Sequence, residues 1–563
     1  MIDIQRLEEI ISLGETVDRE FKSDRNREFT DKEIYEEVVA MANTDGGMLL
    51  IGVENDGSVT GSRPRHGKSI DVHKLKAAIF NNTRPGINTR ISLAHTAHGD
   101  VIIIAVDTYP EICATASGKV LHRITGSDGK PATVPLYPHE QRSRRIDLGL
   151  LDFSAQIFEN TSFEDFNPLE FERLRQTIRT RHGDHSLLEL SDTDLVKALR
   201  LVETQGDRLV PTLAGILLLG TDDVIRKFVP THMFHFQVID KAGNVRVNDD
   251  LISPLIRLIE ETESRFLARL EEDEIMIGMY RMPIPAYHRD AFRETVNNAL
   301  LHRDYSRMGA VFIQWYHDHL LITNPGGFPM GITPDNILVH EPRPRNERLA
   351  EAFKRIGLIE KTGRGVDKIY LGQLWYGRPA PDYSRSDDTA VRLVLASPPA
   401  LREYVKFIYK AEQEGHPFDL DDLLIITALS RQPGLDAEAA SRLIQKSQYP
   451  AERVLEQLVE RGILVVLGDQ KPLQYTLIGE IFRTLFGVDL YIRIHGSDPS
   501  VQEQIILEYV RAHGQISRDE LAQTIHITRD HSRRIIERMV RSGVLQSVKK
   551  STRRVIYVLA DRE

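Results

Sequence analysis

The stretch RETVNNALLH, residues 293–302, carries the most specific pattern in the 563-residue chain. Glu294 and Asn298 are four residues apart, so on a helix they share one face, one turn apart. Ala299 and Leu300 would then point toward a core. A carboxylate at this place can orient and deprotonate a water molecule, and an amide oxygen one turn away can bind Mg²⁺. The alternative interpretation is an amphipathic helix with a solvated polar face.

Two glycine-rich segments follow this predicted helix. Residues 320–323 predict a strand that leads into the turn NPGG at 324–327, and about forty residues later the chain reads GRGVDKI at 363–369. Glycines allow the backbone to approach phosphates closely, and a helix that follows them offers its positive N-terminus to an anion. The pattern therefore indicates a phosphate-binding site.

The order of these motifs resembles the GHKL ATPase superfamily. The subfamily of RecG-helicase-related C-terminal domains and transcriptional regulators is the most similar, with its HRDY run at 302–305 and its RN pair at 345–346. The resemblance implies a Bergerat-type α/β sandwich that binds ATP and Mg²⁺, with Glu294 as the catalytic acid–base group and Asn298 as a Mg²⁺ ligand. The nucleotide-binding residues that it implies are Asn298, His302, Asn324, Gly326, Gly327, Gly363, Arg364 and Gly365.

One position departs from the GHKL pattern. Asn324 stands where the family usually has an aspartate, which accepts a hydrogen bond from the adenine amino group. The side-chain oxygen of Asn324 can accept the same bond, but the negative charge is lost. We expect any hydrolysis to be slow and regulatory.

A second constellation lies near the N-terminus. Residues 14–22 read GETVDREFK, residues 40–47 read AMANTDGG, and residues 51–57 read IGVENDG. Glu20 and Lys22 are two residues apart, so on a strand they project to the same face. With further carboxylates they could hold Mg²⁺ or Mn²⁺ and stabilise a phosphodiester transition state. An ordinary edge-strand ion pair is the alternative interpretation.

This N-terminal string resembles the AlbA-like (AlbA_2) domain of the Schlafen family over about residues 12–140. The resemblance implies nucleic-acid contact, or a metal-dependent RNA endonuclease with Glu15, Glu20 and Glu54 as metal-binding acids. Lys22 belongs to the same implied catalytic site. The zinc cluster of eukaryotic Schlafens cannot be built, because Cys113 is the only cysteine of the chain.

Two C-terminal stretches, about 419–477 and 501–559, share one plan: three helices followed by two short strands. This plan is typical of a winged helix-turn-helix. In the second stretch, residues 529–554 carry a net charge of +7, and basic side chains there would neutralise phosphates. These side chains are Arg529, Arg533, Arg534, Arg538, Arg541, Lys549, Lys550, Arg553 and Arg554. The first stretch is less basic, so we expect it to pack or dimerise. A structural role without nucleic acid is the alternative for the second.

Composition sets the wider limits. Hydrophobic residues make up 41% and charged residues 27% of the chain, which is typical of a soluble protein with several cores. The single cysteine favours a reducing, cytoplasmic setting. No apolar run approaches the roughly 20 residues that span a bilayer, so we expect no membrane association. The net charge of −10 argues against a uniformly basic nucleic-acid binder.

We therefore predict an α/β multidomain protein of five parts. These are an AlbA-like domain (1–148), a connecting α/β domain (149–280), a GHKL-like ATP-binding domain (281–400) and two winged helices (401–490 and 491–563). The predicted function is nucleotide-dependent nucleic-acid binding in transcription control or antiviral defence, with DNA as the first partner, RNA or tRNA as an alternative, and a homo-oligomeric state. Two other functions stay open: a Schlafen-type endoribonuclease and a catalytically silent scaffold.

Overall fold

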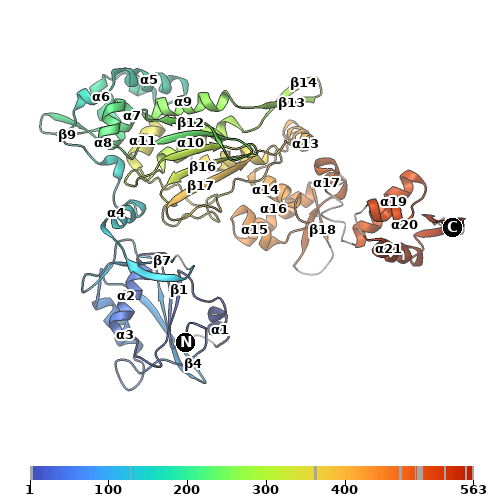
Figure 1. The fold of residues 1–563 in the computed structure, drawn as a ribbon, viewed down its shortest axis with the longest axis horizontal. Helices are drawn as coiled ribbons and strands as arrows, with labels where there is room; N and C mark the ends of the chain where they lie inside the picture. Colours follow the sequence, from blue (N-terminus) through green and yellow to red (C-terminus); the bar gives the residue numbers. More distant parts are fainter. Residues whose placement is uncertain are drawn as a thin grey trace. The chain divides into compact units, whose positions relative to one another are not determined.

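In a computed structural model the chain forms two compact units, residues 1–153 and 154–563. The structure describes residues 4–126, 129–359, 364–467, 472–487, 490, 499–524, 528–551 and 554–560. Both units mix helices with strands (Figure 1), which confirms the predicted α/β multidomain class.

The first unit is built on a four-stranded sheet of order β1-β2-β5-β4, in which β1 runs parallel to β2 and the other pairs are antiparallel. Its elements are α1 (Ile4–Ser12), β1 (Arg19–Lys22), α2 (Asp31–Ala42), β2 (Gly47–Ile51), α3 (Val72–Asn81), β3 (Thr83–Arg84), β4 (Thr89–Thr96), β5 (Gly99–Val106), β6 (Ala114–Thr115), β7 (Leu121–Thr125), β8 (Pro131–Pro135) and α4 (Pro138–Asp147).

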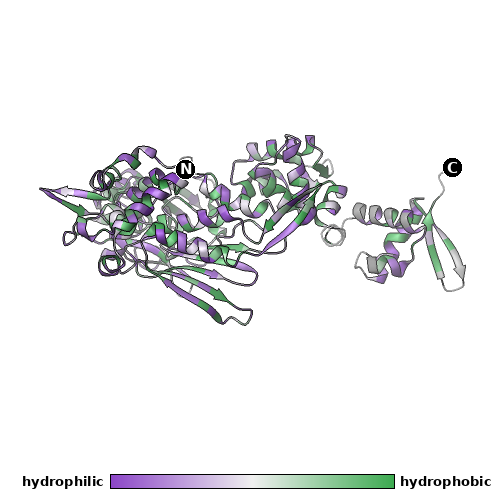
Figure 2. Ribbon diagram, turned by 90° about the horizontal axis from the view of Figure 1, so that it is seen from above, coloured by the Kyte–Doolittle hydropathy of each residue, from purple (hydrophilic) through white to green (hydrophobic). Residues whose placement is uncertain are grey.

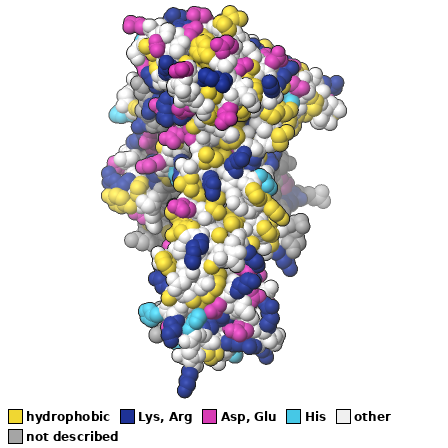
Figure 3. Space-filling view, turned by 90° about the vertical axis from the view of Figure 1, so that its left-hand side faces the viewer, with side chains coloured by type: hydrophobic (Ala, Val, Ile, Leu, Met, Phe, Trp, Pro, Cys, Tyr) yellow, Lys and Arg dark blue, Asp and Glu magenta, His cyan; other side chains and the backbone are white. Residues whose placement is uncertain are grey.

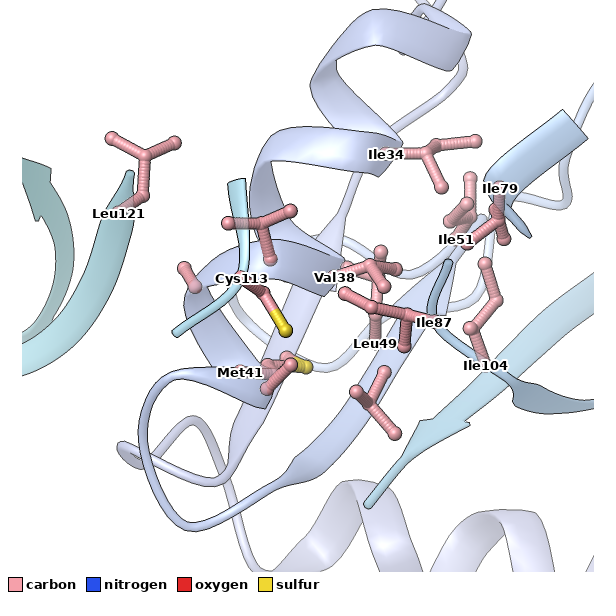
Figure 4. Packing of buried hydrophobic residues seen from close by; sticks show 14 of the residues in the cluster. Ile34, Val38, Met41, Leu49, Ile51, Ile79, Ile87, Ile104, Cys113 and Leu121 are labelled. Atoms are coloured by element: carbon pink, nitrogen blue, oxygen red, sulfur yellow. The ribbon is translucent and has the colours of Figure 1, made fainter. Parts of the chain in front are cut away.

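The core of the first unit lies between α2 and this sheet. Helix α2 begins at a capping box, in which Thr30 and Glu33 satisfy each other's backbone donors. Its apolar stripe then packs against strand residues of β2 and β5; the labelled members in Figure 4 include Ile34, Val38, Met41, Leu49, Ile51 and Ile104. Cys113 points into the same core, and burial raises the pKa of its thiol to about 12. Cys113 is therefore a packing residue.

The second unit is organised around a five-stranded sheet of order β12-β11-β15-β16-β17. Elements up to the last strand of this sheet are α5 (Pro168–Thr180), α6 (Asp192–Ala198), β9 (Val202–Gln205), β10 (Arg208–Pro211), α7 (Leu213–Leu219), α8 (Asp222–Phe228), β11 (Phe234–Ile239), β12 (Val245–Leu251), α9 (Leu255–Leu267), β13 (Glu272–Ile277), β14 (Tyr280–Pro285), α10 (Arg289–Leu301), β15 (Val311–Trp315), β16 (His319–Pro325), α11 (Glu347–Ile356), α12 (Gly365–Leu374) and β17 (Ala390–Ala396).

The boundary expected at residue 280 cuts through this sheet. Strand β11, from the predicted connecting domain, pairs in parallel with β15 from the predicted ATP-binding domain, and β12 pairs with β11. Strands that share a hydrogen-bonded ladder form one structural layer, so residues 234–251 belong with the segment that follows them.

Helices α9 and α10 cover one face of the five-stranded sheet. The Phe266 ring of α9 stacks on Phe292 of α10 with 3.9 Å between centroids, and it lies 5.8 Å from Trp315 of β15. The opposite face carries polar side chains among apolar ones such as Phe312 and Leu321, and there Gln237 donates to Asn248 at 2.7 Å. One face is thus a core and the other is solvated, as is common for sheets with antiparallel pairs.

The C-terminal part of this unit contains two sets of three helices followed by an antiparallel strand pair, the order of elements expected from the sequence. Its elements are α13 (Arg402–Gln413), α14 (Leu420–Leu429), α15 (Ala437–Ile444), α16 (Gln448–Glu460), β18 (Leu464–Leu467), β19 (Gln474–Leu477), α17 (Gly479–Phe486), α19 (Pro499–His513), α20 (Arg518–Thr524), α21 (Arg529–Arg541), β20 (Leu545–Ser551) and β21 (Arg554–Leu559). Hydrophilic and hydrophobic residues are mixed along the helices (Figure 2), and no helix in the described ranges is both long and apolar enough to cross a membrane.

Candidate functional site

A pocket of about 820 Å³ opens between α10, β16, β17 and the start of α12. Glu294, Asn298 and His302 follow one another at intervals of four residues along α10 and its C-cap, and all three line this pocket. The spacing that predicted a shared helix face for Glu294 and Asn298 therefore places both side chains in one cavity, and His302, one turn further along, joins them there.

The floor of the pocket comes from the covered face of the sheet. Asn324 and Ile322 lie on the same face of β16, two residues apart, and Val391 and Leu393 of β17 line the pocket beside them. Asn324 is 5% exposed, and its Oδ1 atom has no hydrogen-bond partner among the described residues. A buried amide oxygen without a partner costs about 1–3 kcal/mol, so the floor presents one unsatisfied polar group in an apolar surround.

The N-terminus of α12 closes the pocket against α10. A Cβ atom on Gly365 would lie 2.0 Å from Oε1 of Glu294, so only glycine allows this approach. The Glu294 carboxylate thus lies beside the N-terminus of a helix, the end that carries the positive part of the helix dipole. Arg364, the N-cap of α12, also lines the pocket, whereas Gly363 lies outside the described residues.

The two glycines of the turn after β16 have different surroundings. Gly327 lines the pocket. Gly326, with φ of 96°, faces Arg345 instead, and a Cβ atom there would lie 2.1 Å from the Arg345 guanidinium and 2.8 Å from Cβ of Asp304. Gly326 therefore makes room for Arg345 and is not among the residues that line the pocket, and its role in nucleotide contact stays a prediction.

The RN pair fixes the C-terminal end of α10. Arg345 donates to the His302 carbonyl at 3.1 Å and to the Gly327 carbonyl at 2.8 Å. Asn346 is fully buried, and its amide donates to the carbonyls of Leu301 and Arg303, both at 2.8 Å. These bonds satisfy carbonyls that the helix leaves open at its end, and they join α10 to the turn after β16. In the sequence the RN pair was noted only as part of a family resemblance, and this structural role was not predicted.

A second amide on α10 holds the chain that leads to the glycine-rich segment. Asn297, fully buried, donates to the Leu358 carbonyl at 2.7 Å. It lies beside Asn298 in the sequence but on a different face of the helix, so the two neighbours have different tasks. Sequence spacing identified Asn298 and missed Asn297, because the partner of Asn297 lies sixty-one residues away.

The His302 ring has a lower pKa than the ring of an exposed histidine. Burial, with a smaller contribution from the nearby Arg345 charge, lowers the pKa of His302 to about 4. Its ring is therefore neutral near pH 7, and its Nδ1 atom is buried without a hydrogen-bond partner among the described residues.

The charged side chains that line the pocket are mainly acidic. Carboxylates are contributed by Glu294, Glu341, Glu347, Glu351 and Asp367, and cations by Arg343, Lys354 and Arg364. A polyphosphate would meet this excess of negative charge unless a divalent cation came with it. Charges of both signs are also interspersed over the face drawn in Figure 3.

The pocket residues fit a nucleotide. The apolar floor with one unsatisfied amide suits the nucleobase, and the glycine at the N-terminus of a helix suits a phosphate group. Glu294 and Asn298 offer oxygen atoms that suit Mg²⁺. The chemical roles of the individual residues stay predictions.

The first C-terminal helical set touches two walls of this pocket. Gln445, which follows α15, accepts a hydrogen bond from the Leu338 backbone and donates to the Pro334 carbonyl, both at 2.8 Å. Leu338 lines the pocket. Helix α12, whose N-terminus closes the pocket, packs against α14. Neither contact was predicted from the sequence.

In the first unit, Glu20 and Lys22 do share a face and form an ion pair. Two further residues join them: Glu37 of α2 lies 3.5 Å from Lys22, and the buried Arg123 of β7 pairs with Glu20 and, at 3.2 Å, with Glu37. Burial alone would lower the pKa of Lys22, but the charges of Glu37 and Glu20 outweigh it and raise that pKa. The two negative charges of the carboxylates are thus matched by the two positive charges of Lys22 and Arg123.

The other predicted acids of this unit have separate partners. Glu15 accepts a hydrogen bond from the Phe21 backbone at 3.1 Å, and Glu54 accepts bonds from Ser23 and Thr60, both at 2.7 Å. In the described ranges, no three His, Cys, Asp or Glu side chains are grouped so that they could hold a metal ion. The structure therefore does not assemble the expected Glu15–Glu20–Glu54 group, and its metal role stays a prediction.

The basic helix α21 buries its apolar side and exposes its arginines, but several are paired. Arg533 pairs with Glu537 at 2.7 Å, Arg538 with Glu503 at 3.0 Å, and Arg529 with Asp519. Arg534 is exposed on the same helix. Arg553, and the side chains of Lys549, Lys550 and Arg554, lie outside the described residues.

Family comparisons match four stretches of the chain. Residues 15–132 match the family described as Schlafen, AlbA_2, and residues 309–395 match Putative ATP-dependent DNA helicase recG C-terminal. Both sequence resemblances are confirmed. Residues 148–235 match a domain of unknown function, and residues 388–563 match DNA glycosylase AlkZ-like. No curated protein matches the chain.

Solved structures include a relative of similar extent. The DIP2311 protein from Corynebacterium diphtheriae is 21% identical, with a TM-score of 0.50 over 86% of this chain and 98% of that one, which supports a shared fold. The N-terminal domain of a putative ATP-dependent DNA helicase RecG-related protein from Nitrosomonas europaea is 20% identical over 19% of this chain and 74% of that one. Its TM-score of 0.14 is too low to infer a shared fold.

The ion-pair network of the first unit yields a stability prediction. Replacing Arg123 by Met leaves Glu20 and Glu37 with one cation between them, and breaking a buried pair costs about 3–5 kcal/mol. We expect faster hydrogen–deuterium exchange in α2 and β1 of the full chain. Arg90→Met is the matched control, because Arg90 is exposed and its pair with Asp107 contributes at most about 1 kcal/mol. Equal exchange in the two variants would contradict a structural role for the network.

Proposed function

We propose that this protein is a nucleotide-dependent nucleic-acid-binding protein, in which ATP with Mg²⁺ occupies the pocket beside α10. The observation that carries the proposal is the assembly of Glu294, Asn298, His302 and Asn324 in one cavity, where Oδ1 of Asn324 has no hydrogen-bond partner among the residues that the structure describes. The match of residues 309–395 to a RecG C-terminal family described as ATP-dependent supports nucleotide binding.

Each pocket residue then has a task. Asn324 accepts a hydrogen bond from the base, and the helix end at Gly365 faces phosphate oxygens. Asn298 supplies an oxygen ligand for Mg²⁺, and the bound cation would offset the negative charge of the phosphates and the surrounding carboxylates. Glu294 orients a water molecule and takes its proton, which suits slow hydrolysis.

Nucleic acid would bind through the C-terminal region. We assign 401–490 and 491–563 as winged helices, and the match of residues 388–563 to a DNA glycosylase-like family supports DNA as the partner. The ion pairs of Arg529 and Arg533 are exposed, so these side chains can exchange a carboxylate for a phosphate at little cost. Transcription control and defence against foreign genetic material remain the settings that we propose.

The contacts of Gln445 supply a route between nucleotide and nucleic acid. Gln445 holds the segment that contains Leu338, and α14 packs on α12, so two pocket walls touch the same helical set. A ligand that changes either wall would bias the position of this set. Coupling of this kind requires a difference in binding free energy between two arrangements, and two hydrogen bonds supply about 1–3 kcal/mol.

A Schlafen-type nuclease is the rival proposal. Glu20 is held between Lys22 and Arg123, so a metal ion would have to displace two cations from this carboxylate. The geometry therefore favours nucleic-acid contact over metal-dependent cleavage for the AlbA_2 stretch.

Calorimetry with Mg²⁺ and ATP tests the pocket. Asn298→Ala removes the proposed metal ligand and should weaken ATP binding at least tenfold, whereas Glu294→Gln should keep binding and lower hydrolysis about a hundredfold or more. Asn248→Ala is the matched control, because Asn248 lies on the outer face of the same sheet. Absence of binding heat in the unmodified chain at saturating ATP would overturn the proposed function.

Fluorescence anisotropy with duplex DNA tests the basic helix. The double variant Arg533→Ala/Arg534→Ala should weaken binding and reduce the slope of log K against log salt concentration by about 2, since two phosphate contacts are lost. Arg453→Ala on α16 should leave both unchanged, because we expect the first helical set to pack rather than bind. An unchanged slope in the double variant contradicts the assignment of α21.

Coupling is tested at Gln445. Gln445→Ala should leave the affinity for ATP within about threefold but abolish the effect of ATP on DNA affinity, because the hydrogen bonds that link Pro334 and Leu338 to the end of α15 are lost. Gln448→Ala, on the exposed side of α16, is the control and should behave like the unmodified chain. Full coupling in Gln445→Ala would show that the signal takes another route.

A further inference from the structure

The single polar group on the pocket floor has two chemically different ends. Asn324 lies among Ile322, Val391 and Leu393, and its Oδ1 atom is buried without a partner in the described part of the chain. The oxygen and nitrogen ends of an amide are told apart only by the hydrogen bonds they make. No neighbour that the structure records fixes which end of Asn324 faces the cavity, so the group can turn over by rotating its last torsion angle.

Purine bases differ at the atom that such a group would meet. Adenine carries an amino group at position 6, which donates, and guanine carries a carbonyl oxygen there, which accepts. An ionised aspartate only accepts, so it pairs with adenine and repels the guanine oxygen. An asparagine pairs with adenine through Oδ1 and, after turning over, with guanine through Nδ2.

His302 can likewise act as a hydrogen-bond donor or as an acceptor. Its Nδ1 atom is buried in the pocket without a partner among the described residues, and a neutral imidazole carries its proton on either nitrogen. The unpartnered nitrogen can therefore donate or accept. The pocket thus contains two polar groups that adapt to the ligand, and neither carries a charge that would select one base.

We infer that Asn324 relaxes base selection, so that the pocket binds guanine nucleotides as well as adenine nucleotides. This inference rests on the proposed nucleotide site and specifies its substrate class as purine nucleoside triphosphates. Asn324 acts as the specificity-determining residue, through a direct hydrogen bond to position 6 of the base.

Calorimetry on the full chain with Mg²⁺ and either ATP or GTP tests the inference. The unmodified chain should bind the two with dissociation constants within about tenfold of each other. Asn324→Asp should weaken GTP at least tenfold relative to ATP, because the carboxylate cannot donate to the guanine oxygen. Asn248→Asp adds the same charge to the outer face of the sheet and should leave both affinities unchanged.

A ligand series on the unmodified chain removes the dependence on a variant that folds. Inosine triphosphate, which keeps the oxygen at position 6, should bind like GTP, and purine riboside triphosphate, which has no group there, should bind about fivefold to tenfold more weakly than ATP. Binding of ATP with GTP a hundredfold weaker overturns the inference and leaves the proposed function standing. Binding of none of these nucleotides overturns both, and an unaltered ATP-to-GTP ratio in Asn324→Asp removes Asn324 as its cause.

Discussion

The position of α10 on the five-stranded sheet is the constraint on which the pocket depends. One side of the helix is held by the stacked rings of Phe266 and Phe292, and its end is held by amide and guanidinium donors from Asn346 and Arg345. Apolar packing sets the distance of the helix from the sheet, while the buried hydrogen bonds set its rotation and its last turn. Both are needed, because a small rotation would move Glu294 away from Gly365.

Local patterns in the sequence predicted the elements of this site well. The four-residue spacing of Glu294 and Asn298 sufficed to place them on one helix face, and the apolar run before Asn324 sufficed to predict a strand. Contacts between distant residues carried no such local signal. Periodicity could not predict the hydrogen-bond partners of Asn297 and Gln445 or the ion pair between Glu37 and Arg123. These contacts join residues far apart in the sequence and follow from the tertiary fold.

The domain boundary at 280 shows the same limit. The predicted boundary between residues 280 and 281 falls inside the hairpin β13–β14, whose strands pair over residues 272–285. The parallel pairing of β11 with β15 joins segments more than seventy residues apart, and no turn signal announces it. At the C-terminus the counted charge of +7 also overstated the basic patch, since Arg529 and Arg538 pair with Asp519 and Glu503 from outside the counted stretch.

The attachment of the pocket to α14 and α15 has a kinetic implication. The segment around Leu338 and the helix α12 both line the cavity, and both contact the first C-terminal helical set. If this helical set must move before a ligand can leave the cavity, the rate of that movement would limit the rate of ligand release. The residence time of the ligand, more than the rate of its hydrolysis, would then determine how long the protein stays in its ligand-bound state.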